Sequence, residues 1–184
     1  MKYKNVKYFD VLVKWLPLGF AITMLCGYVF VTNQFMLRSA ANEPQVQMAR
    51  DITANLTNGM PYNTCAPLSP VDLRGSLAPY VLLYDENHAP MTTGALLDGM
   101  IPVITEGVFA YAKAHGEHHL TWQPARGVRE AIVVIYHAGL QPGYVVVGRS
   151  LQETELRESQ LFAVTEIIWS LSMLGTLFLS VLVA

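Results

Sequence analysis

The segment WLPLGFAITMLCGYVFV, residues 15–31, decides which class of protein this chain belongs to. It is almost wholly apolar, and no charged residue occurs between Lys14 and Arg38. A helix of about 20 apolar residues crosses the roughly 30 Å of bilayer hydrocarbon. We therefore expect a first transmembrane helix at residues 14–37, preceded by a cytoplasmic N-terminus at residues 1–13.

A second apolar segment predicts a second transmembrane helix at residues 161–184. Its stretch from Ile167 to Ala184 contains no charged residue, and Glu166 is expected at its outer edge. Residues 38–160, between the two spans, then form the only domain of the chain that lies outside the membrane.

Composition agrees with a membrane protein and excludes one other class. Of the 184 residues, 52% are hydrophobic and 14% are charged, whereas about a quarter are charged in typical soluble domains. The formal net charge is −2. A nucleic-acid binder needs a basic surface to neutralise phosphates, so we expect no nucleic-acid partner.

The distribution of charge predicts the orientation. Residues 1–14 contain four lysines, whereas residues 38–160 contain eight Lys or Arg against twelve Asp or Glu. The positive-inside rule then places both termini in the cytoplasm and the domain on the extracytoplasmic side of a bacterial cytoplasmic (inner) membrane. A cleaved signal peptide is the alternative, because Ser39-Ala40-Ala41 offers small residues. The apolar run exceeds the usual signal length of about 7–15 residues, which favours an anchor.

The domain is predicted to be α+β, with an antiparallel sheet flanked by helices on one side. A first helix is expected to begin at Asn42 as N-cap, with Pro44 in its first turn. A second helix is expected at residues 106–115, ended by Gly116. Strands are predicted at residues 80–84, 119–123, 129–136 and 144–148. Ser150 and Glu153 have the spacing of a capping box, which predicts a helix running from there into the second span.

Three motifs resemble a known group of proteins. They are ANEPQVQMA at residues 41–49, TWQP at 121–124 with GVR at 127–129, and PGYVVVGRSL at 142–151. Together they look similar to the extracytoplasmic input region of bacterial two-span sensor proteins, which are histidine-kinase-like and carry PAS-like or Cache-type domains. The resemblance implies a PAS-like sensor domain, signal transduction across the membrane and a homodimer.

The sequence departs from that group after the second span. In the kinases, a HAMP linker, a phosphoacceptor helix and an ATP-binding domain follow, whereas this sequence ends at Ala184. No phosphoacceptor or nucleotide site can be assigned to it. If Ala184 is the natural end, either any output passes through a partner or the protein does not signal.

A small-molecule pocket is the first candidate site. Guanidinium groups bind carboxylates, and aromatic rings wall apolar pockets. The residues assigned to this pocket are Tyr80, Tyr84, Trp122, Arg126, Arg129 and Tyr136. The alternative is that the rings belong to the core and the arginines to the surface.

A metal site is the second candidate and the weaker one. His115, His118 and His119 lie close in sequence, and imidazoles are common ligands of zinc and copper. Their spacing matches no recognised zinc signature. A solvated loop after Gly116 explains the same residues, so we expect no metal and no other cofactor.

No catalytic motif is present. The sequence lacks a Gly-x-Ser-x-Gly elbow, a phosphate-binding P-loop and a His-Glu-x-x-His pair. We therefore expect that the chain is not an enzyme.

Small and hydroxyl-bearing residues recur every four positions in both spans. Such stripes let helix backbones approach closely, and hydroxyls bridge helices. The residues assigned to helix packing are Gly19, Thr23 and Gly27 in the first span and Ser172, Thr176 and Ser180 in the second.

Two functions fit these features. The first is a membrane-anchored sensor whose domain binds a small ligand or a protein and signals through its spans to a membrane partner. The second is a non-catalytic accessory or assembly subunit of a larger membrane complex.

Overall fold

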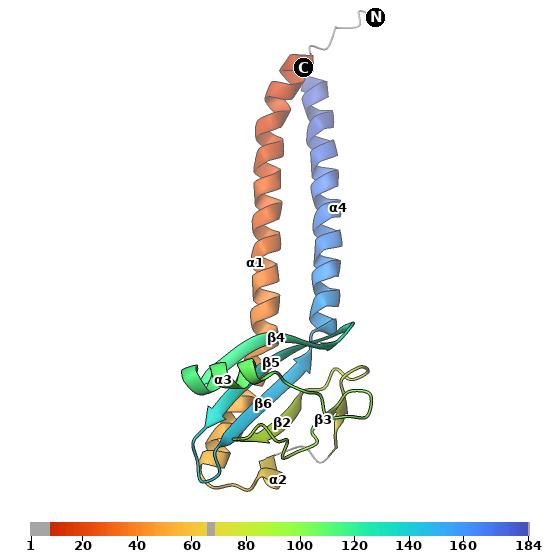
Figure 1. Ribbon diagram of the computed structural model, residues 1–184. Helices are drawn as coiled ribbons and strands as arrows, with labels where there is room; N and C mark the ends of the chain where they lie inside the picture. Colours follow the sequence, from red (N-terminus) through yellow and green to blue (C-terminus); the bar gives the residue numbers. More distant parts are fainter. Residues whose placement is uncertain (1–7, 66–68, 184) are drawn as a thin grey trace, which may run out of the picture. The chain divides into compact units, whose positions relative to one another are not determined.

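The computed structural model describes residues 8–65 and 69–183, which form two compact units (Figure 1). The first unit, called here the helix pair, contains the described residues up to Leu37 together with those from Leu156 onward. The second unit, the central domain, contains Arg38–Glu155. Residues 1–7, which hold three of the lysines used to predict orientation, lie outside the described residues.

The helix pair is built from the first part of α1 (Tyr8–Thr57) and most of α4 (Gln152–Val183). Both helices are long and apolar enough to cross a bilayer. Their large apolar side chains point outward, with Phe20 at 63% and Phe178 at 64% of full exposure. In water such a surface would be unfavourable at about 25 cal/mol per Å², so it suits an apolar solvent.

The central domain is an α+β structure built on a four-stranded antiparallel sheet. In spatial order the strands are β2 (Tyr80–Asp85), β6 (Gly143–Ser150), β5 (Val128–His137) and β4 (Glu117–Ala125). All four predicted strands are confirmed, and each extends one or two residues past a predicted end. The fold class is therefore as expected from the alternation of apolar runs and turn residues.

Shorter elements complete the domain. They are α2 (Tyr62–Cys65), β1 (Val71–Asp72), β3 (Ala95–Leu96) and α3 (Glu106–His115). The parallel pair β1–β3 was not expected from the sequence. α3 has the predicted bounds and ends at Gly116, whose φ of 89° suits glycine and whose N–H donates to the Ala112 carbonyl at 2.8 Å.

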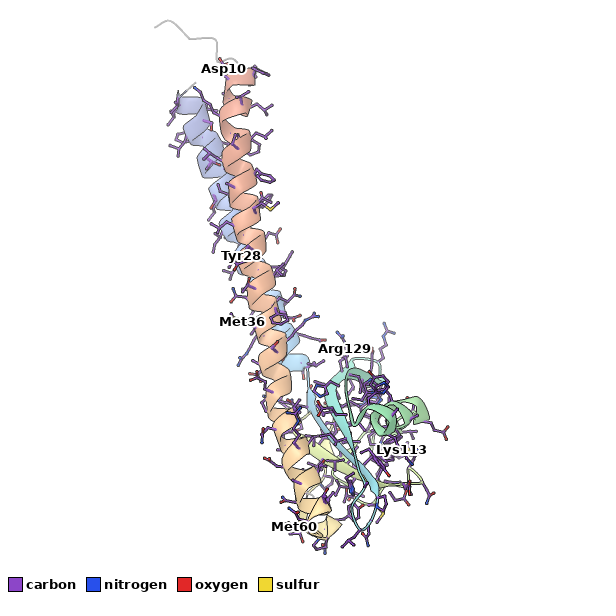
Figure 2. The ribbon with its side chains drawn as sticks, turned by 90° about the vertical axis from the view of Figure 1, so that its left-hand side faces the viewer. Asp10, Tyr28, Met36, Met60, Lys113 and Arg129 are labelled. Carbon is purple, nitrogen blue, oxygen red and sulfur yellow. The ribbon has the colours of Figure 1, made fainter. Side chains whose placement is uncertain are left out.

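Helices cover both faces of the sheet, so the prediction of helices on one side only was wrong (Figure 2). On one face α3 contributes Val108, Phe109 and Ala112 to the core. On the other face α1 contributes Ala49, Ile52 and Leu56. The reason is that β5 and β6 are buried along both faces and both faces must be shielded from water.

One predicted helix start was wrong, and a second was displaced by one residue. α1 runs without a break from Tyr8 to Thr57, so no helix begins at Asn42 and Pro44 lies inside the helix. One proline removes a single helical hydrogen bond, and the packing of the following turns on the sheet offsets that loss. At the second start, Ser150 is the last residue of β6, and its Oγ accepts from the N–H of Gln152 at 3.3 Å. The helix therefore begins one residue later than a capping box at Ser150 requires.

Candidate functional site

The six residues assigned to a ligand pocket are spread over three places in the central domain. Tyr84 and Tyr136 flank Tyr144 in one row across β2, β6 and β5. Tyr80 and Trp122 belong to rows nearer the other end of the same sheet face. Tyr84 and Tyr136 are thus joined through Tyr144, whereas Tyr80 and Trp122 lie on the two opposite edge strands and do not meet.

The two arginines lie apart from these aromatic residues. Arg126 is exposed at the turn between β4 and β5. Arg129 is exposed too, and it alternates along β5 with Val128, whose side chain joins the core on the α3 face. Its guanidinium donates to Glu155 in the first turn of α4. The arginines therefore do not face the aromatic residues as the pocket hypothesis requires.

The tyrosine row is part of a packed aromatic cluster. The Tyr84 and Phe109 rings lie 5.1 Å apart, and the Phe109 and Tyr144 rings lie 4.9 Å apart. His88 stacks on Phe109 at 4.6 Å, and Tyr136 lies 5.2 Å from Tyr144. These spacings are those of aromatic rings in contact. The cluster packs α3 against the sheet and is part of the hydrophobic core.

The opposite end of this sheet face contains a buried carboxyl group that sequence reasoning missed. Glu130 is only 1% exposed, and neither of its carboxyl oxygens has a hydrogen-bond partner among the described residues. It pairs across the sheet with Trp122 on β4 and Ser150 on β6. Burial raises the pKa of Glu130 to about 7. This side chain therefore changes charge near neutral pH inside the core.

Tyr80 supplies the other unpartnered polar group at this end. Its hydroxyl is buried and has no partner within the described part of the chain. Burial raises the pKa of Tyr80 well above its usual range, and the charge of Glu130 raises it further. The ring lies over Gly148, where an added Cβ would come within 2.3 Å of its Cζ. Glycine at this position is what admits the Tyr80 ring.

A small cavity of about 210 Å³ lies between the end of α1 and the turn that joins β5 to β6. Its lining residues are Leu56, Gly59, Met60, Pro61, Tyr62, His137, Leu140 and Gln141. His137 is buried, and its Nδ1 has no partner among the described residues. Its Nε2 lies 3.5 Å from the Tyr62 hydroxyl, which donates to the Gln141 carbonyl at 2.9 Å. Burial lowers the pKa of His137, which keeps the imidazole neutral at pH 7.

This cavity can hold a small molecule. A mostly apolar wall with one neutral imidazole suits an uncharged ligand that carries one hydrogen-bond donor or acceptor. No sequence pattern indicated this cavity, because Tyr62 and His137 are 75 positions apart and no motif links them. The two meet because the end of α1 packs on the sheet and carries Tyr62 of α2 to the end of β5.

The three histidines assigned to a metal site do not converge. His115 and His118 both lie against the Tyr111 ring, at 4.0 and 4.2 Å between ring centres. His119 lies 3.1 Å from the Glu117 carboxylate, which also accepts from Arg50 at 3.0 Å. Adjacent residues of a strand point to opposite faces, which separates His118 from His119. Within residues 8–65 and 69–183 no group of three or more His, Cys, Asp or Glu side chains is arranged to hold a metal ion.

The residues assigned to helix packing divide into two groups. Gly19 faces the Met173 side chain, and the Trp169 indole N–H donates to the Thr23 hydroxyl at 2.9 Å. Gly27, by contrast, would have nothing within 4 Å of an added Cβ. The first two residues therefore contact α4, and the third borders open space.

On α4 the hydroxyls bond along their own helix. Thr176 donates to the Ser172 carbonyl at 2.9 Å, and Ser180 donates to the Thr176 carbonyl at 2.8 Å. Ser180 is also buried. Thr176 and Ser180 thus donate their hydroxyl hydrogen bonds to the backbone of α4 and do not use them to bridge the two helices.

Comparison with protein families, with curated protein sequences and with solved structures finds no match to this chain.

Proposed function

We propose that this chain is a two-span membrane protein of the sensor type, whose extracytoplasmic PAS-like domain binds a ligand and signals through its spans to a partner. The observation that carries the proposal is the apolar exterior of the helix pair. Large side chains such as Phe20, Leu174 and Phe178 are each more than half exposed there. A folded domain with its own two-faced core lies between these helices in the sequence.

Charge supports the proposed orientation. Lys14 is the last charged residue before the apolar part of α1, and the excess of acidic residues at positions 38–160 suits the extracytoplasmic side. The PAS-like assignment is supported by an antiparallel sheet with helices packed on it. Residues 89–91 also form backbone hydrogen bonds with β2. The Asp85 N–H donates to the Ala89 carbonyl at 3.0 Å, and the Met91 N–H donates to the Leu83 carbonyl at 2.7 Å.

The His137 cavity is the proposed ligand site of the domain. It touches the end of α1 through Leu56 and the turn before β6 through Gln141. β6 ends at Ser150, and α4 begins at Gln152. A ligand that shifts this turn is thereby connected through one strand to the helix that enters the membrane.

Membrane embedding is tested by washing host membranes with alkaline carbonate. We expect the full chain to remain in the pellet, as integral proteins do. Ligand binding is tested by thermal unfolding of the detergent-solubilised full chain against a panel of small neutral molecules. A compound that binds only the folded form raises the melting temperature, and His137→Phe should abolish the rise. Loss of the chain to the carbonate supernatant contradicts the proposal.

The second candidate, an accessory subunit of a membrane complex, is favoured by Glu166. This ionisable residue lies within the apolar part of α4 and has no hydrogen-bond or ion-pair partner among the described residues. If the chain is such a subunit, it co-purifies in mild detergent with a larger membrane protein at a fixed ratio. A melting temperature that rises with ligand, in a chain without such a fixed-ratio partner, favours the sensor.

A further inference from the structure

We propose that a groove on the helix pair beside Glu166 is the docking site for a transmembrane helix of a different protein, which carries a basic side chain near its middle. The inference rests on the proposed function, because it requires the helix pair to lie in a bilayer. It names the kind of partner that the proposed signalling needs.

The groove has a volume of about 320 Å³ and is formed by α1 and α4 within the helix pair. Its lining residues are Thr23, Cys26, Gly27, Phe30, Phe162, Thr165, Glu166 and Trp169. All of these are apolar, small, aromatic or hydroxyl-bearing except Glu166. The groove is therefore an apolar surface with one ionisable group in it.

Contacts between the two helices fix the depth of Glu166. Gly19 faces Met173, and the Phe30 and Phe162 rings lie 5.8 Å apart. In this antiparallel register, each step forward on α1 corresponds to one step back on α4. Residue 166 consequently lies level with Cys26.

Cys26 is the midpoint of the uncharged segment of α1. It lies twelve residues from Lys14 and twelve from Arg38, about 18 Å along the helix in each direction. Half of the hydrocarbon thickness is about 15 Å. If the bilayer is centred on this segment, Glu166 lies near its middle, whereas the sequence alone led us to expect it at the outer edge.

The chain itself supplies no positive charge at this depth. Between Lys14 and Arg38, and from Glu158 to Ala184, the sequence contains no Lys, Arg or His. Lys14 donates to the Val183 carbonyl at 3.2 Å, at the far end of the pair. An ionisable residue inside a membrane is costly unless it faces a partner or water, and it marks a functional site by default.

The hydroxyl groups that line the groove already form hydrogen bonds within the helix pair. Thr23 donates to the Gly19 carbonyl at 2.8 Å and accepts from Trp169. Thr165 donates to the Leu161 carbonyl at 2.8 Å. Glu166 has no hydrogen-bond or ion-pair partner among the described residues, so a complementary donor has to come from outside the chain.

Charge complementarity identifies which molecule fills the groove. A second copy of the chain brings another Glu166 to the groove and no cation, which like-charge repulsion disfavours. A helix of another protein with a Lys or Arg at mid-span satisfies the charge and fills the apolar groove. Gly27, with nothing within 4 Å of an added Cβ, lets such a helix approach closely.

The test is photo-cross-linking of the full chain in membranes of its native host. The photoreactive residue p-benzoylphenylalanine replaces Phe162 in the groove, or Leu171 on the same helix as the matched control. Leu171 is 64% exposed and does not line the groove. We expect the Phe162 position to cross-link one other polypeptide, within a transmembrane segment that contains Lys or Arg, and the Leu171 position not to do so.

The charge is tested by substitution. Glu166→Gln should lower the cross-link yield about tenfold, equivalent to about 1.4 kcal/mol, whereas Glu158→Gln on the same helix should leave it unchanged. Glu166→Lys should abolish the cross-link, and exchanging the partner's basic residue for Glu should restore it. This restoration shows that the variants fold.

Three results overturn the inference: a cross-link to a second copy of the chain, a cross-link to lipid only, or a yield that Glu166→Gln does not change. An alkaline carbonate wash before irradiation separates this failure from failure of the proposed function. If the chain stays in the membrane and one of these results is found, only the docking site is refuted. If the wash removes the chain, the membrane assignment fails as well.

Discussion

Replacing Glu130 by Gln should remove a pH dependence of stability that the buried carboxyl group imposes on the central domain. In the unfolded chain this group titrates near its usual value of 4.5, whereas burial raises its pKa to about 7 in the folded domain. Between these two values the folded chain holds a proton that the unfolded chain has released. The contribution of Glu130 to the free energy of unfolding therefore falls as the pH rises.

The size of this effect follows from the two pKa values. One proton contributes a slope of about 1.4 kcal/mol per pH unit. From pH 4.5 to about 7 the domain therefore loses about 3 kcal/mol, and the loss levels off above pH 7. Gln has nearly the same shape and cannot ionise, so Glu130→Gln should lack this loss.

His137 contributes a slope of the opposite sign. Burial lowers its pKa below 6.5, so below that pH the unfolded chain binds a proton that the folded chain does not. The contribution of His137 to the free energy of unfolding is complete above pH 6.5 and is lost as the pH falls through the pKa of the folded state. In the wild type, the pH dependence of the free energy of unfolding therefore combines the opposite effects of Glu130 and His137. The difference between wild type and Glu130→Gln isolates the effect of the carboxyl group.

The assay is urea unfolding of the full chain in detergent at pH 5, 6, 7 and 8. Trp15 and Trp169 are replaced by Phe throughout, which leaves Trp122, the cross-strand neighbour of Glu130, as the only reporter. Glu43→Gln, an exposed carboxylate on α1, is the matched control and should follow the wild type. Equal slopes for wild type and Glu130→Gln between pH 5 and 7 would refute the reasoning.

Three further predictions concern packing. Tyr80→Phe removes a buried hydroxyl that has no partner among the described residues, so thermal unfolding should show a gain of up to about 1 kcal/mol; a clear loss would mean that the hydroxyl is bonded. Gly148→Ala places a Cβ 2.3 Å from the Tyr80 ring and should cost about 1–3 kcal/mol. Gly107→Ala is the matched control, because a Cβ added there has no atom within 4 Å, and alanine in a helix should raise the melting temperature slightly. Trp169→Phe removes the hydrogen bond to Thr23 and should weaken the helix pair by about 0.6 kcal/mol in dodecyl sulfate titration, and no change would contradict its role.

Local signals predicted the elements of the central domain well. α3 has the predicted bounds because apolar residues at helical spacing precede a glycine that takes a positive φ. The strands followed from apolar runs bounded by turn residues. These features depend on neighbouring residues, which a single sequence displays.

Features that depend on distant contacts were not predictable. α1 continues through Asn42 and Pro44, which read locally as a helix start. Its later turns pack on β-strands that follow much further along the chain, and no local rule includes this packing. The cover on both sheet faces was missed for the same reason.

The candidate site illustrates the same limit. Tyr84 and Tyr136 share one row because both pair with Tyr144 on β6, whereas Arg129 points away from them by strand alternation. Glu130 follows the charged Arg129 at the start of a run that is apolar from Ala131 to Ile135. Its burial depends on cover from both neighbouring strands, which sequence periodicity alone does not reveal.

The most direct test of the account is the accessibility of single cysteines to a membrane-impermeant maleimide in spheroplasts of the bacterial host. Cys26 and Cys65 are first replaced by Ser, and one cysteine is then placed at Asp10 on α1 or at Asn87, an exposed position of the central domain. With two spans and an extracytoplasmic domain, Asn87→Cys is labelled in intact spheroplasts and Asp10→Cys is labelled only after lysis. Labelling of Asp10→Cys in intact spheroplasts, or protection of Asn87→Cys until lysis, would contradict the two-span topology.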